Sequence, residues 1–200
     1  MKPFLIIVAA YLIGSIPFSH LFPRIKGHDV RQKGTKNVGA TNALVVAGPL
    51  MGALALAGDI GKGYLVVYLA QIFSGNLWVI ALAGLAAIIG HDFSVFLRFK
   101  GGKGVATTGG IFLAIDFLFG IVVLLFWVLL ILISRYFIRS TLIILACVPV
   151  AMLILGLSKE VVFFGVGAFI LALIAHREDV KKIISGTELT TSESMKKAFS

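Results

Sequence analysis

A succession of apolar runs, each close to the length that crosses a lipid bilayer, fills most of this 200-residue chain. A helix of about 20 apolar residues spans the hydrocarbon core, and only helices and closed barrels satisfy their backbone hydrogen bonds there. The pattern therefore predicts an all-α integral membrane bundle of about seven transmembrane helices. The runs cover approximately residues 4–21, 43–73, 77–90, 105–119, 121–138, 142–157 and 161–175.

Composition supports this class and excludes an ordinary soluble domain. Of all residues, 59% are hydrophobic and 14% are charged, whereas soluble proteins average about a quarter charged. We expect one membrane domain over residues 1–200, with residues 176–200 as a cytoplasmic tail. The single cysteine, Cys147, cannot form an intramolecular disulfide, and its apolar surroundings predict packing inside the bundle.

The second apolar run, residues 43–73, is too long for one straight helix. Gly48 and Pro49 interrupt it, which predicts a short half-helix followed by a full span. Asp59 and Lys62 lie three residues apart on one face of that span, and we expect them to pair.

Basic residues predict the orientation. All but Lys2, Lys62 and Lys159 of the 18 lysines and arginines fall on one side of the predicted topology, and the net charge is +9. The positive-inside rule then places the N-terminus outside and the C-terminus in the cytoplasm. Anionic lipid headgroups attract such a face, but lipid attraction does not require the glycines and asparagines in the same loops. Those residues indicate a ligand.

The first polar segment, KGTKNVGATN (residues 33–42), mixes small residues with lysines, hydroxyls and amides. Gly34 and Gly39 allow close backbone approach, and the polar groups beside them suit a phosphorylated ligand. The segment also fits a turn before a helix capped by Thr41 or Asn42. Its candidate ligand-binding residues are Thr35, Lys36, Asn37, Thr41 and Asn42.

The second polar segment, FKGGKGVATTGG (residues 99–110), precedes another apolar run. It is not a nucleotide-binding P-loop, because Leu97 and Gly104 stand where that motif requires a glycine and a Ser or Thr. A glycine-rich turn, a lysine and a helix start still favour an anion, although glycine and lysine are also ordinary loop residues. The candidates are Gly101, Gly102, Lys103, Gly104 and Thr107.

The third polar segment, AHREDVKKIISGTE (residues 175–188), follows the last apolar run. His176 supplies a titratable group at the membrane boundary, and Arg177 supplies a bidentate phosphate binder beside Asp179. The alternative is a solvated amphipathic helix end. The four histidines show no metal-binding spacing and no GxSxG elbow is present, so we predict no metal, no cofactor and no serine nucleophile.

Together, KGTKNVGATN, GHDFSVFLRFKGGKGVATTGG and HREDVKKIISGTE resemble the motifs of the bacterial acyl-phosphate:glycerol-3-phosphate 1-O-acyltransferases, in the same order. The resemblance covers nearly the whole chain, with further support from GSIPFSHLF and GDIGKG. It implies a multi-pass enzyme of the bacterial inner membrane whose site faces the cytoplasm. Such enzymes transfer a fatty acyl group from acyl phosphate to the sn-1 hydroxyl of glycerol 3-phosphate, which gives lysophosphatidate and phosphate in the first step of phospholipid synthesis.

The resemblance also implies roles for individual residues. Catalysis is expected of Thr35, Asn37, Lys103 and His176. Substrate binding is expected of Lys36, Thr41, Asn42, Gly101, Gly102, Gly104, Thr107, Arg177 and Asp179. The partners would be the two substrates and membrane lipids, without nucleic acid. Since acyl phosphate is an activated mixed anhydride, the alcohol can attack it directly, and either His176 or a substrate phosphate takes the proton.

The chain departs from the family pattern at several positions. Thr35 stands for the usual serine, Val45 for an arginine and Asp179 for an asparagine, and RYFIRST (residues 135–141) replaces a small, serine-containing stretch. If the missing arginine is compensated, the candidate cations are Arg31, Lys36 and Arg139. A weakly active divergent paralogue is therefore one alternative, and a non-enzymatic transporter or channel for a phosphorylated anion is another. A lipid-binding scaffold explains the charge but not the glycine and asparagine loops.

Overall fold

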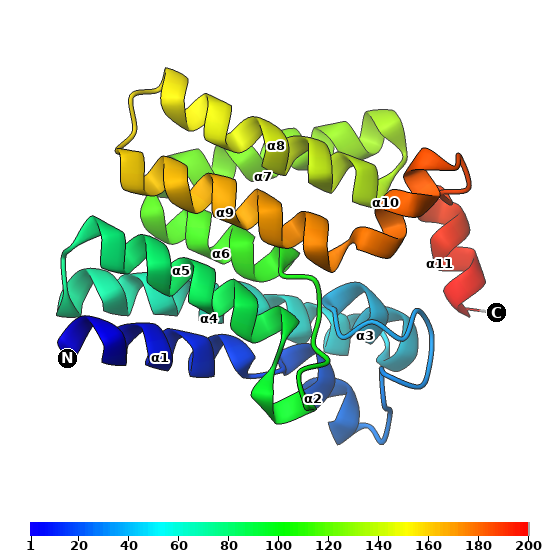
Figure 1. The fold of residues 1–200 in the computed structure, drawn as a ribbon. Coiled ribbons are helices and arrows are strands. Elements are labelled where there is room, and N and C mark those ends of the chain that lie inside the picture. The colour runs from blue at the N-terminus through cyan, green and yellow to red at the C-terminus, as the bar shows by residue number, and fades with distance from the viewer. Residues whose placement is uncertain (200) are drawn as a thin grey trace.

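The computed structural model describes residues 1–199, which form α-helices, one 3-10 turn and no β-strand. Long helices lie roughly parallel, and shorter ones gather with the polar loops at one end (Figure 1). This arrangement confirms the predicted all-α membrane bundle. The long apolar helices are α1 (Lys2–Ser15), α4 (Pro49–Phe73), α5 (Leu77–Asp92), α6 (Val105–Ile115), α7 (Phe117–Ser134), α8 (Phe137–Ile154) and α9 (Lys159–Ala175). The shorter elements are α2 (Phe18–Ile25), α3 (Ala40–Ala47), η1 (Val95–Leu97), α10 (Arg177–Ile184) and α11 (Thr191–Phe199).

Fewer than seven segments have the length of a full span. Within residues 1–199, five helical segments are long and apolar enough, and a sixth arises if α9 and α10, bent by 75°, count as one. Helix α6 has 11 residues and is therefore about 16 Å long, too short to cross the hydrocarbon core alone. The five segments are Lys2–Ile25, Pro49–Phe73, Leu77–Leu97, Phe117–Ser134 and Phe137–Ile154.

Two helix breaks test the expected boundaries. The predicted half-helix is confirmed, because α3 ends at Ala47, the following Gly48 has a φ of +90°, and α4 begins at Pro49. The boundary expected between the apolar runs 105–119 and 121–138 is wrong, since α6 ends at Ile115 and α7 begins at Phe117. The Asp116 carboxylate caps α7 by accepting a hydrogen bond from the N–H of Phe119 at 2.8 Å.

Glycines bring α4 and α6 into backbone contact, which fixes the start of α6 in the bundle. A Cβ atom at Gly63 would lie 2.2 Å from the carbonyl oxygen of Thr107, and one at Gly110 would lie 2.0 Å from that of Ile60. Small residues at such positions permit close helix packing in membranes. Larger side chains there would push the two helices apart.

A buried polar cluster ties the first span to α4 and α5. The predicted pair is confirmed, with Lys62 Nζ 2.8 Å from Asp59 Oδ1. Ser19 Oγ donates to the other carboxylate oxygen of Asp59 at 2.5 Å, and His91 Nδ1 lies 3.5 Å from the first. Lys62 also donates to the carbonyl of Ile16, at the interruption between α1 and α2, at 2.8 Å. The ion pair and these hydrogen bonds stabilise the Asp59 and Lys62 charges, which would be costly to place unpaired in hydrocarbon.

The outer helices present apolar side chains outward. In α7 only Gly120 is fully buried, as a lipid-facing helix requires. Cys147 on α8 is exposed, so the expectation that it packs inside the bundle is wrong. Lipid is as apolar as a bundle core, and an apolar neighbourhood therefore does not distinguish the two faces of a membrane helix.

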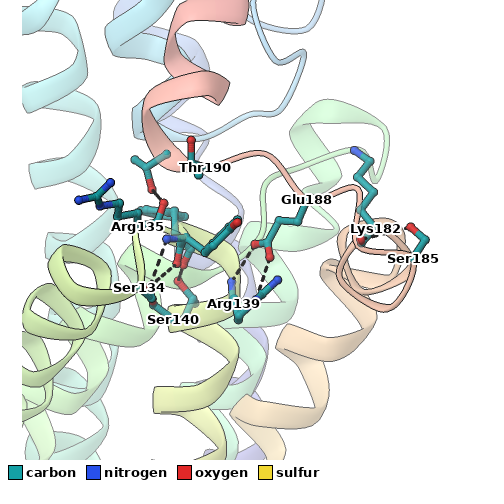
Figure 2. Close-up of polar contacts among 12 residues, drawn as sticks. Ser134, Arg135, Arg139, Ser140, Lys182, Ser185, Glu188 and Thr190 are labelled. Carbon is teal, nitrogen blue, oxygen red and sulfur yellow. Dashed lines mark hydrogen bonds and ion pairs between the residues drawn. The ribbon is translucent and has the colours of Figure 1, made fainter.

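The C-terminal segment docks onto the α7–α8 turn (Figure 2). The Glu188 carboxylate accepts hydrogen bonds from Arg139 Nε at 3.0 Å and from the Arg139 backbone N–H at 3.3 Å. The backbone N–H of Thr191 donates to the carbonyl of Arg135 at 2.8 Å. Helix α11 then contacts α3. The segment thus bridges three elements at the polar end of the bundle.

Candidate functional site

The three polar segments gather at one end of the bundle (Figure 1), and residues of all three line a cavity of about 240 Å³. Loops far apart in sequence supply its mouth, and the faces of α6, α7 and α8 continue it between the helices. The polar residues that line it are Asn37, Thr41, Asp59, His91, Lys103, Thr108, Thr141 and His176. We call the part lined by Asn37, Thr41, Lys103 and His176, which belong to the three polar segments, the mouth. A polar entrance therefore opens into an apolar interior.

The Asn42 side chain holds the first loop together by hydrogen bonds to the loop backbone. Its side chain is buried, and its amide nitrogen lies 2.7, 3.2 and 2.9 Å from the carbonyl oxygens of Val30, Lys33 and Asn37. Its amide oxygen accepts from the N–H of Thr35 at 2.9 Å. Asn42 is not among the residues that line the cavity, so the structure places this predicted ligand binder behind the loop rather than in the site.

The loop presents only part of its polar set to the cavity. Asn37 and Thr41 line it, whereas Thr35 and Lys36 are exposed beside it. Thr35 Oγ1 accepts a hydrogen bond from the N–H of Asn37 at 3.4 Å, which helps to orient that residue. Lys36 has a φ of +60°, a left-handed conformation at the turn.

The glycine segment docks against the end of α5. The N–H groups of Gly101 and Gly102 donate at 3.0 Å to the last carbonyls of that helix. A Cβ atom at Gly102 would lie 2.2 Å from His91 Nε2, so only glycine fits there. These two amides are thus hydrogen-bonded within the protein and do not face a ligand. The residue of this segment that lies at the cavity mouth is Lys103.

Amides free for an anion follow the two glycines. Gly104 has a φ of +69° and precedes α6. Within residues 1–199 the N–H groups of Gly104, Val105 and Ala106 donate to no protein acceptor, as expected for the first turn of a helix. Such a turn attracts anions. Thr107, a predicted binder, is instead buried with its hydroxyl 3.3 Å from His91 Nδ1 and does not line the cavity.

Asp179 joins Lys103 to His176. Its carboxylate Oδ2 is bound by the Lys103 ammonium and lies 3.0 Å from His176 Nδ1. Burial raises the pKa of Asp179, but hydrogen bonds from His176 and Lys103 outweigh it and hold the pKa at about 2. The predicted binder Asp179 is therefore an anion paired behind the cavity.

His176 is buried and lines the cavity. Because Nδ1 faces Asp179, the ring nitrogen left for a ligand is Nε2, which has no hydrogen-bond partner in the part of the chain that the structure describes. The neighbouring Arg177 is exposed instead, with its guanidinium 3.9 Å from Glu178. It does not line the cavity.

The apolar interior of the cavity was not predicted from sequence. Its residues recur at spacings of three and four, which puts each set on one helix face. Only knowledge of which face meets a cavity rather than lipid would have found them. The walls are Gly109, Phe112 and Leu113 on α6, then Gly120, Val123, Leu124 and Trp127 on α7, then Phe137, Thr141, Ile144 and Leu145 on α8.

None of the three candidate cations that could compensate for the missing arginine at Val45 lines the cavity. Arg31 makes two hydrogen bonds to the Asp29 carboxylate, at 3.0 and 2.8 Å, and these hold the pKa of Asp29 well below its ordinary value. Arg139 binds the C-terminal segment, and Lys36 is exposed. Among the cavity-lining residues that the structure describes, Lys103 is therefore the one lysine or arginine.

Known proteins are similar to this chain in both sequence and fold. The family model described as glycerol-3-phosphate acyltransferase matches residues 4–186. A glycerol-3-phosphate acyltransferase of Thermotoga petrophila is 39% identical over 90% of this chain and 92% of its own. A glycerol-3-phosphate acyltransferase 2 of Moorella thermoacetica is 40% identical over 92% of this chain and 95% of its own.

Solved structures agree. The crystal structure of PlsY, an integral membrane glycerol 3-phosphate acyltransferase, in its glycerol 3-phosphate form superposes with a TM-score of 0.88 and 31% identity, over 95% of this chain and 96% of that one. Its lysophosphatidic acid form matches with the same TM-score and 30% identity. The prediction from the sequence motifs is confirmed: the chain belongs to the glycerol-3-phosphate acyltransferase family.

Proposed function

We propose that this protein transfers a fatty acyl group from acyl phosphate to the sn-1 hydroxyl of glycerol 3-phosphate. The products are 1-acylglycerol 3-phosphate and inorganic phosphate. The observation that carries the proposal is the position of His176 and Lys103, where a polar mouth meets an apolar groove. A soluble anion and a fatty acyl chain require these two environments side by side. The names of the relatives supply the acceptor.

Glycerol 3-phosphate binds at the mouth in this proposal. Its phosphate meets the Lys103 ammonium and the free amides from Gly104 to Ala106, where the start of α6 adds positive potential. Asn37 and Thr41 supply hydrogen bonds to the glycerol hydroxyls. The acyl chain of the donor lies in the groove between α6, α7 and α8, so its carbonyl stops near His176.

The reaction then needs no covalent acyl-enzyme. His176 Nε2 takes the proton of the sn-1 hydroxyl, and the oxygen attacks the acyl carbonyl. The bond between the carbonyl carbon and the phosphate oxygen breaks, and the departing phosphate takes the proton from His176. Lys103 offsets charge on the phosphates, and Asp179 fixes the ring so that Nε2 faces the substrate.

We place the cavity on the cytoplasmic side of the bacterial inner membrane, with the N-terminus outside. The basic residues of the polar loops support this orientation, because lysine and arginine concentrate in cytoplasmic loops. A cytoplasmic mouth also admits soluble glycerol 3-phosphate directly.

An assay in detergent tests the proposal. Purified protein is incubated with palmitoyl phosphate and labelled glycerol 3-phosphate, and labelled lysophosphatidate is separated by chromatography. We expect product with wild type, and with Lys103→Ala either a raised KM for glycerol 3-phosphate or no turnover. Absence of product from acyl phosphate, acyl-CoA and acyl carrier protein alike would reject the enzyme. An unchanged Lys103→Ala protein would remove Lys103 from the site.

A further inference from the structure

Gly109 is a glycine in the middle of α6 that no packing contact requires. It lines the cavity, and a Cβ atom there would meet nothing within 4 Å. Its neighbour Gly110 differs, because a Cβ atom would collide with the backbone of α4. Glycine weakens a helix interior relative to alanine. The space beside Gly109 therefore belongs to the cavity and not to the helix packing.

We propose that Gly109 determines acyl-chain selectivity by leaving open the passage from the polar mouth to the deep groove. This inference rests on the proposed acyltransferase function. Val105, Gly109 and Leu113 share one face of α6 at a spacing of four, and all line the cavity. A chain that extends from the mouth along this face must pass Gly109.

Distance along α6 makes the passage selective. Gly109 lies about 7.5 Å beyond Gly104, given the rise of a helix, and Leu113 about 6 Å further. A short acyl chain ends before Gly109, whereas a long one crosses it. At Leu113 the groove closes, because a Cβ atom at Gly120 of α7 would lie 2.7 Å from the Leu113 Cα.

The side chains that line the groove from α7 and α8 are fixed by contacts with one another. Trp127 Nε1 donates to Thr141 Oγ1 at 2.9 Å, which links α7 to α8. The rings of Trp127 and Phe137 pack edge to face with centroids 5.3 Å apart. Fixed side chains on α7 and α8 mean that a larger residue at position 109 narrows the groove instead of displacing its wall.

Two variants test the inference, Gly109→Ala and Gly109→Leu. Initial rates are measured with palmitoyl phosphate and with butyryl phosphate, at saturating glycerol 3-phosphate. For Gly109→Leu we expect kcat/KM for palmitoyl phosphate to fall about tenfold or more, and that for butyryl phosphate to stay within about twofold. Gly109→Ala should fall between wild type and Gly109→Leu. Neither should lower the thermal unfolding temperature, since both replace a helical glycine that faces open space.

Gly61→Leu is the matched control. Gly61 is also in a helix interior with nothing within 4 Å of an added Cβ, but it lies on α4 and is exposed away from the cavity. Its substitution should leave both donors unaffected.

Equal palmitoyl to butyryl ratios in wild type and Gly109→Leu would overturn the inference, as would an equal loss of both donors. If Gly109→Leu does not fold, the same comparison with Gly109→Ala decides. Wild type that is inactive with both donors contradicts the proposed function itself, which is a separate result.

Discussion

The imidazole Nδ1 of His176 lies 3.0 Å from the carboxylate of Asp179, and the other ring nitrogen, Nε2, has no hydrogen-bond partner within residues 1–199. A carboxylate in this place accepts the Nδ1 proton and leaves Nε2 with the lone pair that a base needs. Lys103 binds the same carboxylate, so one residue positions both the proposed base and the proposed phosphate-binding cation. The departure from the family pattern at position 179 therefore contributes order and does not place an unpaired charge at the mouth.

Replacement of His176 should act on turnover more than on binding. We expect His176→Ala to lower kcat by about 10²–10⁴-fold, the usual contribution of a general base, with little change in the KM for glycerol 3-phosphate. Steady-state kinetics over both substrates measure this. His28→Ala, outside the residues that line the cavity, is the control. A loss below about tenfold would mean that a substrate phosphate takes the proton instead.

Acid should remove the stability that Asp179 contributes. Because the folded-state pKa of Asp179 is about 2, below the ordinary 3.8, its ionised form stabilises the fold above about pH 4. That contribution is lost as the pH falls through about 2. Thermal unfolding in detergent should show wild type more stable than Asp179→Ala above pH 5, with the difference shrinking between about pH 4 and pH 2. A difference that is constant down to pH 2 would contradict the ionised pairing.

Loss of the Asn42 side chain should loosen the first loop. Asn42→Ala removes several buried hydrogen bonds and should cost about 2–4 kcal/mol, with faster proteolysis in residues 30–37 and reduced activity. Asn76→Ala at the opposite end of the bundle removes only the cap of α5 and should cost about 1 kcal/mol without loss of activity. If the Asn42→Ala loop resists protease as wild type does, the side chain does not hold the loop.

The C-terminal segment should detach when Glu188 is removed. Glu188→Ala breaks both hydrogen bonds to Arg139 shown in Figure 2, and hydrogen exchange in residues 187–198 should accelerate about tenfold or more. Mass spectrometry of peptic fragments measures this. Glu193→Ala removes a carboxylate that accepts hydrogen bonds from Thr190, three residues earlier in the same segment, and should have a smaller effect. Equal exchange in the two variants would rule out Glu188 as the anchor.

The sequence predicted those features of the fold that depend on residues close together in the chain, such as a helix boundary or an ion pair within one helix. Gly48 and Pro49 end α3 and start α4, and Asp59 meets Lys62 on one helix face, because both effects act within a few residues. The α6–α7 break escaped prediction, although Asp116 is the single acid between two apolar stretches. Its capping role was the signal.

The site was only partly predictable for a different reason. Motifs identified Asn37, Lys103 and His176, which the structure brings to one cavity. The Asn42 side chain points into the loop because it binds carbonyl oxygens elsewhere in the loop, and residue spacing in the sequence does not predict these contacts. The residues of the groove could not be predicted from the sequence, because the groove lining and the lipid-facing surface are equally apolar. The pattern of apolar residues therefore does not distinguish one face of a membrane helix from the other.

The hydrogen bond from Lys62 to the Ile16 carbonyl has a mechanical consequence. An interrupted span is the usual place for a membrane helix to hinge. Here the interruption between α1 and α2 is clamped by an ammonium group that also neutralises Asp59. Movement of α2 away from α4 would break this hydrogen bond and the one from Ser19 to Asp59, in surroundings that offer no water to replace them. The interruption in the first span is therefore held rigid and is a poor place for a hinge.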